Sequence, residues 1–173
     1  VLFRSERWLG YQDPGLLGPD PLEERRRAQL AELPISAALE PRLPPILAAE
    51  LPAVKALQRL LESHGHCVLV AEAGSAVGLV TLADLQSALV SRPEEPLRLI
   101  DCRRGDLVWL PLEAHLDRLE DQLTPQGLRQ VPVFAVEPGL GGYLPQGLPP
   151  AGLPIGSFRG LASRDGIARA LAG

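Results

Sequence analysis

Two short stretches have the residue types and spacing of a polar site at the start of a helix. Thr81 ends an apolar run and precedes Asp84 by three residues, and Ser163 ends a second such run. A hydroxyl beside the free N–H groups of a helix start suits a phosphate, and a nearby carboxylate can accept hydrogen bonds from ribose hydroxyls. The Thr81 and Asp84 pair also fits a capping box, which would stabilise the helix without any ligand. Both interpretations remain open on the sequence.

The elements that would position Thr81 follow from hydrophobic spacing. A helix opened by Pro52 has Val54, Leu57, Leu60 and Leu61 on one apolar face. Runs of apolar and β-branched residues between turn signals indicate strands. The predicted order is a short strand near Ile46–Ala48, the helix, strands at Cys67–Ala71 and Val77–Thr81, and a helix at Leu82–Val90.

The same order of elements occurs a second time. It comprises an extended run at Asp106–Trp109, a helix opened by Pro111, strands at Val131–Ala135 and Phe158–Ser163, and a helix at Ile167–Leu171. Five elements repeated in one order indicate an internal duplication.

Residue matches between the copies predict where the second copy is longer. Leu57 matches Leu116 at an offset of 59, Val68 matches Val131 at 63, and Gly78 matches Gly160 at 82. These offsets predict two insertions in the second copy. The small one extends its first helix, and the large one is a segment rich in glycine and proline at 137–157. An insertion between two hairpin strands costs little closure entropy.

The first 34 residues lie outside the duplication. Asp20 can cap a helix that starts at Pro21 and stops near Leu33. The basic run Arg25–Arg27 follows Glu23 and Glu24, and we interpret it as a solvated helix face. The predicted organisation is therefore a linker and helix at 1–34 and two units at 35–93 and 98–173.

Composition narrows the classes of function. The 173 residues are 46% hydrophobic with a net charge of −4, which argues against a nucleic-acid binder. The two cysteines fit neither a metal site nor a disulfide framework, and a reducing cytosolic setting is the simpler expectation. His64 and His66 lack further metal ligands nearby in sequence. The sequence contains none of the hydrolase, zinc-protease or phosphate-loop signatures, so we expect no enzyme.

The duplicated pattern resembles CBS domains, which occur in pairs. The resemblance is carried by Val77-Gly78-Leu79-Val80-Thr81-Leu82-Ala83-Asp84 in the first copy, and by Val131-Pro132-Val133 and Arg159-Gly160-Leu161-Ala162-Ser163 in the second. It covers about residues 35–173. It implies an α/β (α+β) fold of two βαββα units related by a pseudo-two-fold axis, with a helical N-terminal extension.

The resemblance also implies a ligand site. Thr81 and Asp84 match the family's nucleotide-binding positions, and the adenine would lie near Val68 and Ile46. In the second copy Ser163 keeps the hydroxyl, but Gly166 stands where the family has the ribose-binding aspartate. Asp165 comes one residue too early, so its side chain would point elsewhere. For Ser163 we favour a capping role alone.

On this resemblance the chain is a regulatory module that senses AMP, ADP or ATP and forms a homodimer. It is similar to the cytoplasmic C-terminal domain of a bacterial CLC-type chloride channel or transporter, tethered to the membrane by a domain upstream of Val1. The alternative is a structural dimerisation and interaction module without a ligand, in a transporter, a membrane protease or a signalling protein. The substitution at Gly166 and the long insertion favour that alternative.

Overall fold

The computed structural model describes residues 18, 20–136 and 152–173. The predicted order of strand, helix, strand, strand and helix is present twice. The first unit comprises β2 (Ile46–Ala48), α4 (Ala53–Ser63), β3 (Cys67–Glu72), β4 (Ser75–Thr81) and α5 (Leu82–Ser91). The second comprises β5 (Leu110–Pro111), α6 (Leu116–Gln126), β6 (Gln130–Phe134), β7 (Phe158–Ser163) and α7 (Arg164–Ala172). The fold is thus mixed α/β, as expected.

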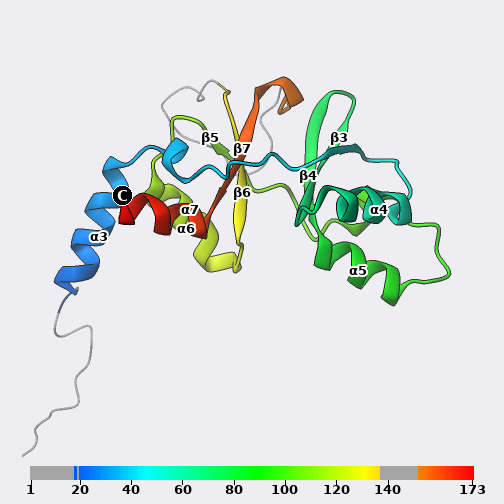
Figure 1. The fold of residues 1–173 in the computed structure, drawn as a ribbon, viewed down its shortest axis with the longest axis horizontal. Helices are drawn as coiled ribbons and strands as arrows, with labels where there is room; N and C mark the ends of the chain where they lie inside the picture. Colours follow the sequence, from blue (N-terminus) through cyan, green and yellow to red (C-terminus); the bar gives the residue numbers. More distant parts are fainter. Residues whose placement is uncertain (1–17, 19, 137–151) are drawn as a thin grey trace, which may run out of the picture.

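The two sheets have the same topology. In each, the short first strand pairs in parallel with the central strand, which pairs antiparallel with the third, giving the orders β2-β3-β4 and β5-β6-β7. The register shifts at the same place in both hairpins, after Val70 in β3 and after Val133 in β6. Figure 1 shows the two sheets side by side in the middle of the molecule, with the helices of both units along one side.

The expected small insertion in the second unit's first helix is wrong. Helices α4 and α6 are both 11 residues long, and their ends adopt the same left-handed cap at His64 and Gly127. Their buried positions correspond at the offset of 63 that also relates the central strands; they are Ala53, Ala56 and Leu60 in α4, and Leu116, Leu119 and Leu123 in α6. Leu57 therefore does not match Leu116, and one insertion, between β6 and β7, accounts for the offset of 82.

Pro111 does not open a helix. It lies in β5 opposite Phe134, and α6 begins five residues later at Leu116. A proline can end a short edge strand because that position need not donate to the ladder. The expected extended run at Asp106–Trp109 correspondingly shifts to Leu110–Pro111.

A short 3₁₀ helix precedes each unit, and we call the segment that contains it the lead-in of that unit. Each lead-in packs on the other unit. The 3₁₀ helix η1 (Ile35–Ala38) precedes the first unit, yet Ile35 and Ala38 are buried in the core of the second. The 3₁₀ helix η2 (Leu99–Cys102) follows the first unit and contributes Leu99 and Cys102 to that unit's core. The chain thus crosses between units at each lead-in (Figure 1).

Three hydrophobic clusters hold the fold together. One lies between the first sheet and helices α4 and α5, and a second occupies the same place in the other unit. The third joins the two sheets and is formed by buried residues Leu69, Ala76, Leu107, Phe134 and Leu153. Trp109 and Phe158 pack on Phe134, with ring centroids 6.2 and 5.5 Å away. The sheets therefore share one apolar interface.

The N-terminal helix α3 (Pro21–Glu32) is capped by Asp20 as expected, and it packs on α6. The prediction of a purely solvated basic face is wrong for Arg26 and Arg27. Arg26 forms an ion pair with Glu120, and Arg27 lies 3.2 Å from Glu120 and 3.1 Å from Asp121.

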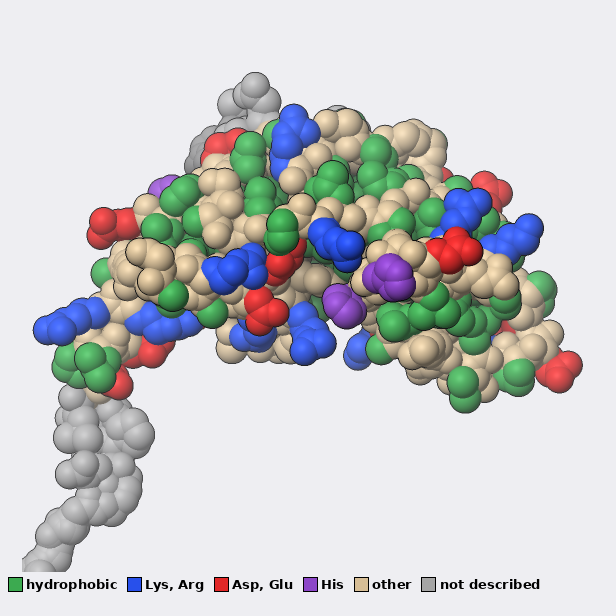
Figure 2. Space-filling model, viewed as in Figure 1, with side chains coloured by type: hydrophobic (Ala, Val, Ile, Leu, Met, Phe, Trp, Pro, Cys, Tyr) green, Lys and Arg blue, Asp and Glu red, His purple; other side chains and the backbone are tan. Residues whose placement is uncertain are grey.

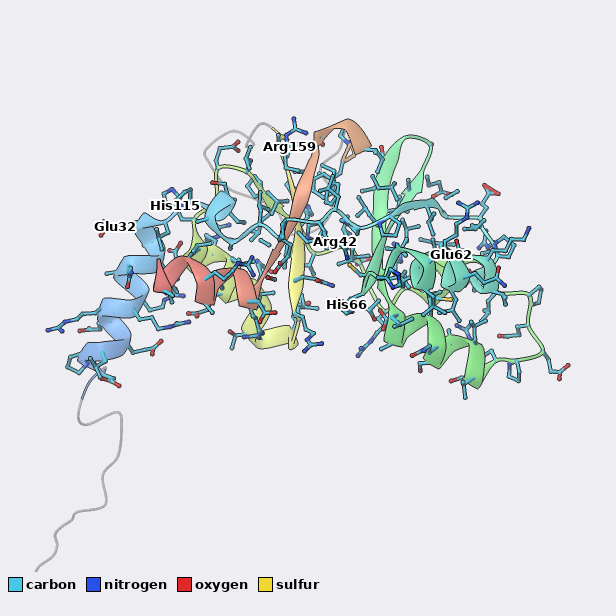
Figure 3. The ribbon with its side chains drawn as sticks, viewed as in Figure 1. Glu32, Arg42, Glu62, His66, His115 and Arg159 are labelled. Carbon is cyan, nitrogen blue, oxygen red and sulfur yellow. The ribbon has the colours of Figure 1, made fainter. Side chains whose placement is uncertain are left out.

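Figure 3 shows His115 at the end of α3, where its Nδ1 lies 2.7 Å from the Ala31 carbonyl oxygen. The helix is thus docked on the second unit.

Most of the predicted 137–157 insertion, residues 137–151, lies outside the described residues. Its last part is ordered against the first unit. The Ala76 N–H donates to the Leu153 carbonyl at 2.8 Å, and the Ile155 N–H donates to the Gly74 carbonyl at 2.9 Å. This segment therefore joins the β3–β4 hairpin to the second unit. Among the described residues, no helix is both long and apolar enough to cross a bilayer.

Candidate functional site

Thr81 and Asp84 form a complete capping box at the start of α5. The Asp84 N–H donates to Thr81 Oγ1 at 3.0 Å, and the Thr81 N–H donates to Asp84 Oδ2 at 3.0 Å. Asp84 is 9% exposed, so its carboxylate is held in a fixed position. The box leaves the Thr81 hydroxyl hydrogen and Asp84 Oδ1 available, because a hydroxyl both donates and accepts and a carboxylate has two oxygens.

Two arginines follow η2, and the second of them lies beside this box. The Arg104 Nη1 is 3.7 Å from Asp84 Oδ1, and its side chain is 85% exposed. Arg103 donates to the Val77 carbonyl at 2.7 Å. Its side chain covers Gly78, where a Cβ would lie 3.0 Å from Arg103 Cδ. A glycine at position 78 thus lets the arginine lie flat on β4, with its guanidinium at the Val77 carbonyl.

An apolar row crosses the first sheet next to Thr81. Ile46, Leu69 and Leu79 are register partners, and Thr81 lies two residues beyond Leu79 on the same face of β4. Ile46 is 41% exposed and could contact a flat apolar ligand. Val68 points the other way: its side chain is fully buried in the core beneath α4 and α5. Of the two residues expected near an adenine, Ile46 lies on the face that carries Thr81, and Val68 can offer only its backbone.

The corresponding position in the second unit has a different chemistry. Ser163 caps α7 by accepting from the Gly166 N–H at 2.9 Å, and its hydroxyl donates to the carboxylate of Glu40. Gly166 cannot be replaced by a larger residue without movement, because a Cβ there would lie 2.1 Å from the Ala38 carbonyl oxygen. Asp165 is exposed, away from the cap. The structure thus places Ser163 in a cap, without a carboxylate equivalent to Asp84.

The cysteines and histidines do not gather near Thr81. Burial raises the pKa of Cys67 to about 12 and also raises the pKa of Cys102, so both thiols stay protonated at neutral pH. His64 adopts the left-handed conformation at the end of α4. Among the described residues no cluster of histidine, cysteine and carboxylate side chains could hold a metal ion.

The fold can now be compared with solved structures. A CBS domain pair solved with 5′-methylthioadenosine and S-adenosyl-L-methionine aligns with a TM-score of 0.58 at 14% identity, over 81% of this chain and 99% of that one. A putative signal-transduction protein with CBS domains from Burkholderia ambifaria gives 0.56 at 16% identity, over 84% and 91%. The chain has the fold of a CBS domain pair.

The CBS domain of a bacterial CNNM/CorC family Mg²⁺ transporter is similar over a larger share of this chain. Its TM-score is 0.58 at 18% identity, and the alignment covers 92% of this chain and 89% of that one. No family model matches the sequence, and no curated protein matches it. At these identities the similarity establishes the CBS-pair fold, and the ligand must be argued from the residues of this chain.

Sequence reasoning missed three charged residues, namely Arg103 and Arg104 after η2 and Glu40 after η1. They lie in the lead-ins rather than in the strand and helix that carry the motif. A signal was present in the sequence, since Leu39-Glu40 and Arg103-Arg104 stand at equal distances after the ends of η1 and η2. That signal has meaning only once each lead-in is known to pack on one unit's third strand.

Proposed function

We propose that the chain is a regulatory CBS pair that binds an adenine nucleotide at Thr81 and Asp84. The observation that carries this proposal is the start of α5, where a fixed hydroxyl and carboxylate lie beside Arg104 and Thr81 shares a face of β4 with an apolar row. The Thr81 hydroxyl can donate to a phosphate oxygen at the start of α5 while keeping its cap. Asp84 Oδ1 can accept from the ribose, and Ile46 and Leu79 provide an apolar surface for the base.

Arg104 gives the proposed site a preference for phosphorylated ligands. Its guanidinium is exposed and ends near the one Asp84 oxygen that the cap does not use. A guanidinium binds phosphate with charge-assisted hydrogen bonds, which are stronger than neutral ones. The proposed ligands are therefore AMP, ADP or ATP, and uncharged adenosine should bind more weakly.

Calorimetry with ATP and with adenosine tests the assignment. Arg104→Ala should weaken ATP binding by about tenfold, corresponding to about 1.4 kcal/mol, and leave adenosine binding nearly unchanged. Asp84→Asn keeps an oxygen that can accept from the Thr81 N–H, so it should fold, yet it should weaken both ligands. Arg59→Ala, an exposed arginine on α4, is the matched control. Equal affinities for ATP in the parent and in Arg104→Ala would refute the role of the arginine.

We further propose that the module regulates an attached membrane transport protein from the cytoplasmic face. The similarity to the CBS domain of a Mg²⁺ transporter, over 92% of this chain, supports a transporter host. The chloride channel or transporter remains a prediction from the sequence resemblance. A ligand can act on such a host only through different affinities for two arrangements of the module.

The second candidate function is a scaffold that dimerises without a ligand. It is favoured by exposed apolar side chains on α4 and α5, where Val54, Leu61 and Val90 are 55%, 52% and 80% exposed. Figure 2 shows hydrophobic side chains on the surface of this unit's helices. A thermal shift with millimolar ATP distinguishes the candidates, because binding to the folded state must raise apparent stability. No shift would favour the scaffold.

A further inference from the structure

The starts of α5 and α7 are surrounded by equivalent elements, so their residues can be compared position by position. Helices η1 and η2 each pack against one unit's third strand and last helix, and both are four residues long. Two residues after η1 stands Glu40, and two residues after η2 stands Arg104. The start of α5 thus has a cation where the start of α7 has an anion.

The lead-in that contains η1 is hydrogen-bonded through its backbone to the second unit. Leu39 forms a β-bridge with Ala162, and the Glu40 N–H donates to the Leu161 carbonyl at 2.8 Å. In the first unit, the described hydrogen bond between the equivalent segment and β4 comes from the Arg103 side chain. The lead-in that contains η1 is therefore fixed to β7 by an isolated bridge and a backbone hydrogen bond.

The carboxylate of Glu40 lies at the start of α7. It accepts the Ser163 hydroxyl hydrogen, and Arg169 of α7 lies 3.3 Å away on its outer side. Ser163 is 6% exposed, and in turn accepts from the Gly166 N–H at the start of α7. A carboxylate near a helix N-terminus is favoured by the helix dipole. The space that a ribose-binding aspartate would need is taken by the Ala38 carbonyl oxygen.

We propose that this chain occupies the start of α7 with its own Glu40, which takes the place of a ligand anion there. The pair then binds one nucleotide, at the start of α5, and uses the second unit to anchor the segment that leads from α3. This inference deepens the proposed function, because the number of sites depends on that function, whereas the contact between Glu40 and Ser163 does not.

A measurement without any ligand tests the contact between Glu40 and Ser163. Glu40→Gln and Ser163→Ala should each lower the midpoint of thermal unfolding by several degrees, and the double variant should lower it by little more than the larger single effect. Glu62→Gln, an exposed glutamate on α4, is the matched control and should shift the midpoint by less than a degree. Fully additive shifts of the two variants would overturn the proposal, because residues in direct contact must be coupled.

Calorimetric titration with ATP then counts the sites. We expect one ATP per chain, lost in Asp84→Asn and unchanged in Ser163→Ala. Two ATP per chain, with Ser163→Ala removing one, would overturn the occupation of this position by Glu40. If the parent binds no ATP, the proposed nucleotide function fails, and the coupling between Glu40 and Ser163 still decides whether Glu40 occupies the start of α7.

Discussion

At the scale of single residues, the two units differ most at the third residue of their last helices. In the first unit this position is Asp84, which completes a capping box, and in the second it is Gly166. The difference follows from the lead-ins: the backbone of Ala38 approaches α7 so closely that any side chain at position 166 would overlap it. The glycine is thus required by packing rather than by backbone conformation.

Gly166→Ala provides a direct test of this packing. Although alanine is the better helix former by about 1 kcal/mol, a Cβ 2.1 Å from a backbone oxygen forces η1 away from the unit. We expect a net loss of at least about 2 kcal/mol in the free energy of unfolding, measured by urea denaturation. Gly156→Ala, where the Cβ would enter open space, should change it by less than about 0.5 kcal/mol. Similar values for both variants would contradict the close approach.

The residues of the first site were predictable where they lie in one continuous motif. Thr81 and Asp84 are separated by three residues on one helix start, and this spacing determines their geometry. Arg104 and Glu40 could not be placed, because their positions depend on which unit each lead-in packs against. That choice is made by buried side chains such as Ile35 and Leu99, whose partners lie far away in the sequence.

At the scale of elements, α3 docks on the second unit through the fully buried Leu30 and also carries ion pairs to α6. Arg26 and Arg27 face Glu120, whose side chain is only 16% exposed, and the hydrogen bond from Arg26 lowers the pKa of Glu120. Positions on α4 equivalent to this acidic face include Leu57, which is apolar. The pairing of a basic helix with an acidic one was hidden in the sequence, because each charged face alone is typical of solvated helices.

This pairing predicts a pH dependence. The folded pKa of Glu120 lies below its unfolded value, so the ion pair contributes fully above the ordinary glutamate pKa of about 4.3 and its contribution is lost as the pH falls through the folded pKa. Glu120→Gln should therefore lower the free energy of unfolding by about 1 kcal/mol at pH 7, and by progressively less toward pH 3. Urea denaturation across this range measures the difference. A deficit that stays constant down to pH 3 would show that the charge is not responsible.

Strand and helix boundaries were predicted well where hydrophobic patterns are long, and poorly where one residue type has two uses. The strand Phe158–Ser163 agrees with its predicted bounds. Pro111 was misassigned because proline suits both the first turn of a helix and the end of an edge strand. The pairing of Pro111 with Phe134 decides between them, and that contact depends on the tertiary structure.

At the scale of the whole molecule, the third hydrophobic cluster joins the two units through one apolar interface. Phe134 from the second sheet and Leu69 from the first are both fully buried in it. Leu153 joins them from the segment before β7, which is itself bonded to the β3–β4 hairpin. A regulatory signal that changes how the sheets meet would have to repack this cluster, because closely packed interiors do not deform continuously.

Leu153→Ala tests whether the end of the insertion holds the units together. Leu153 is fully buried, so its truncation should cost about 2–5 kcal/mol through lost burial and the cavity left behind. Leu22→Ala on α3 removes the same atoms from a side chain that is 71% exposed, and should cost less than about 0.5 kcal/mol. Denaturation followed by near-UV and far-UV circular dichroism should give one shared transition for the parent. A near-neutral Leu153→Ala, or two separate transitions in the parent, would mean that the sheets fold independently and that this segment does not couple them.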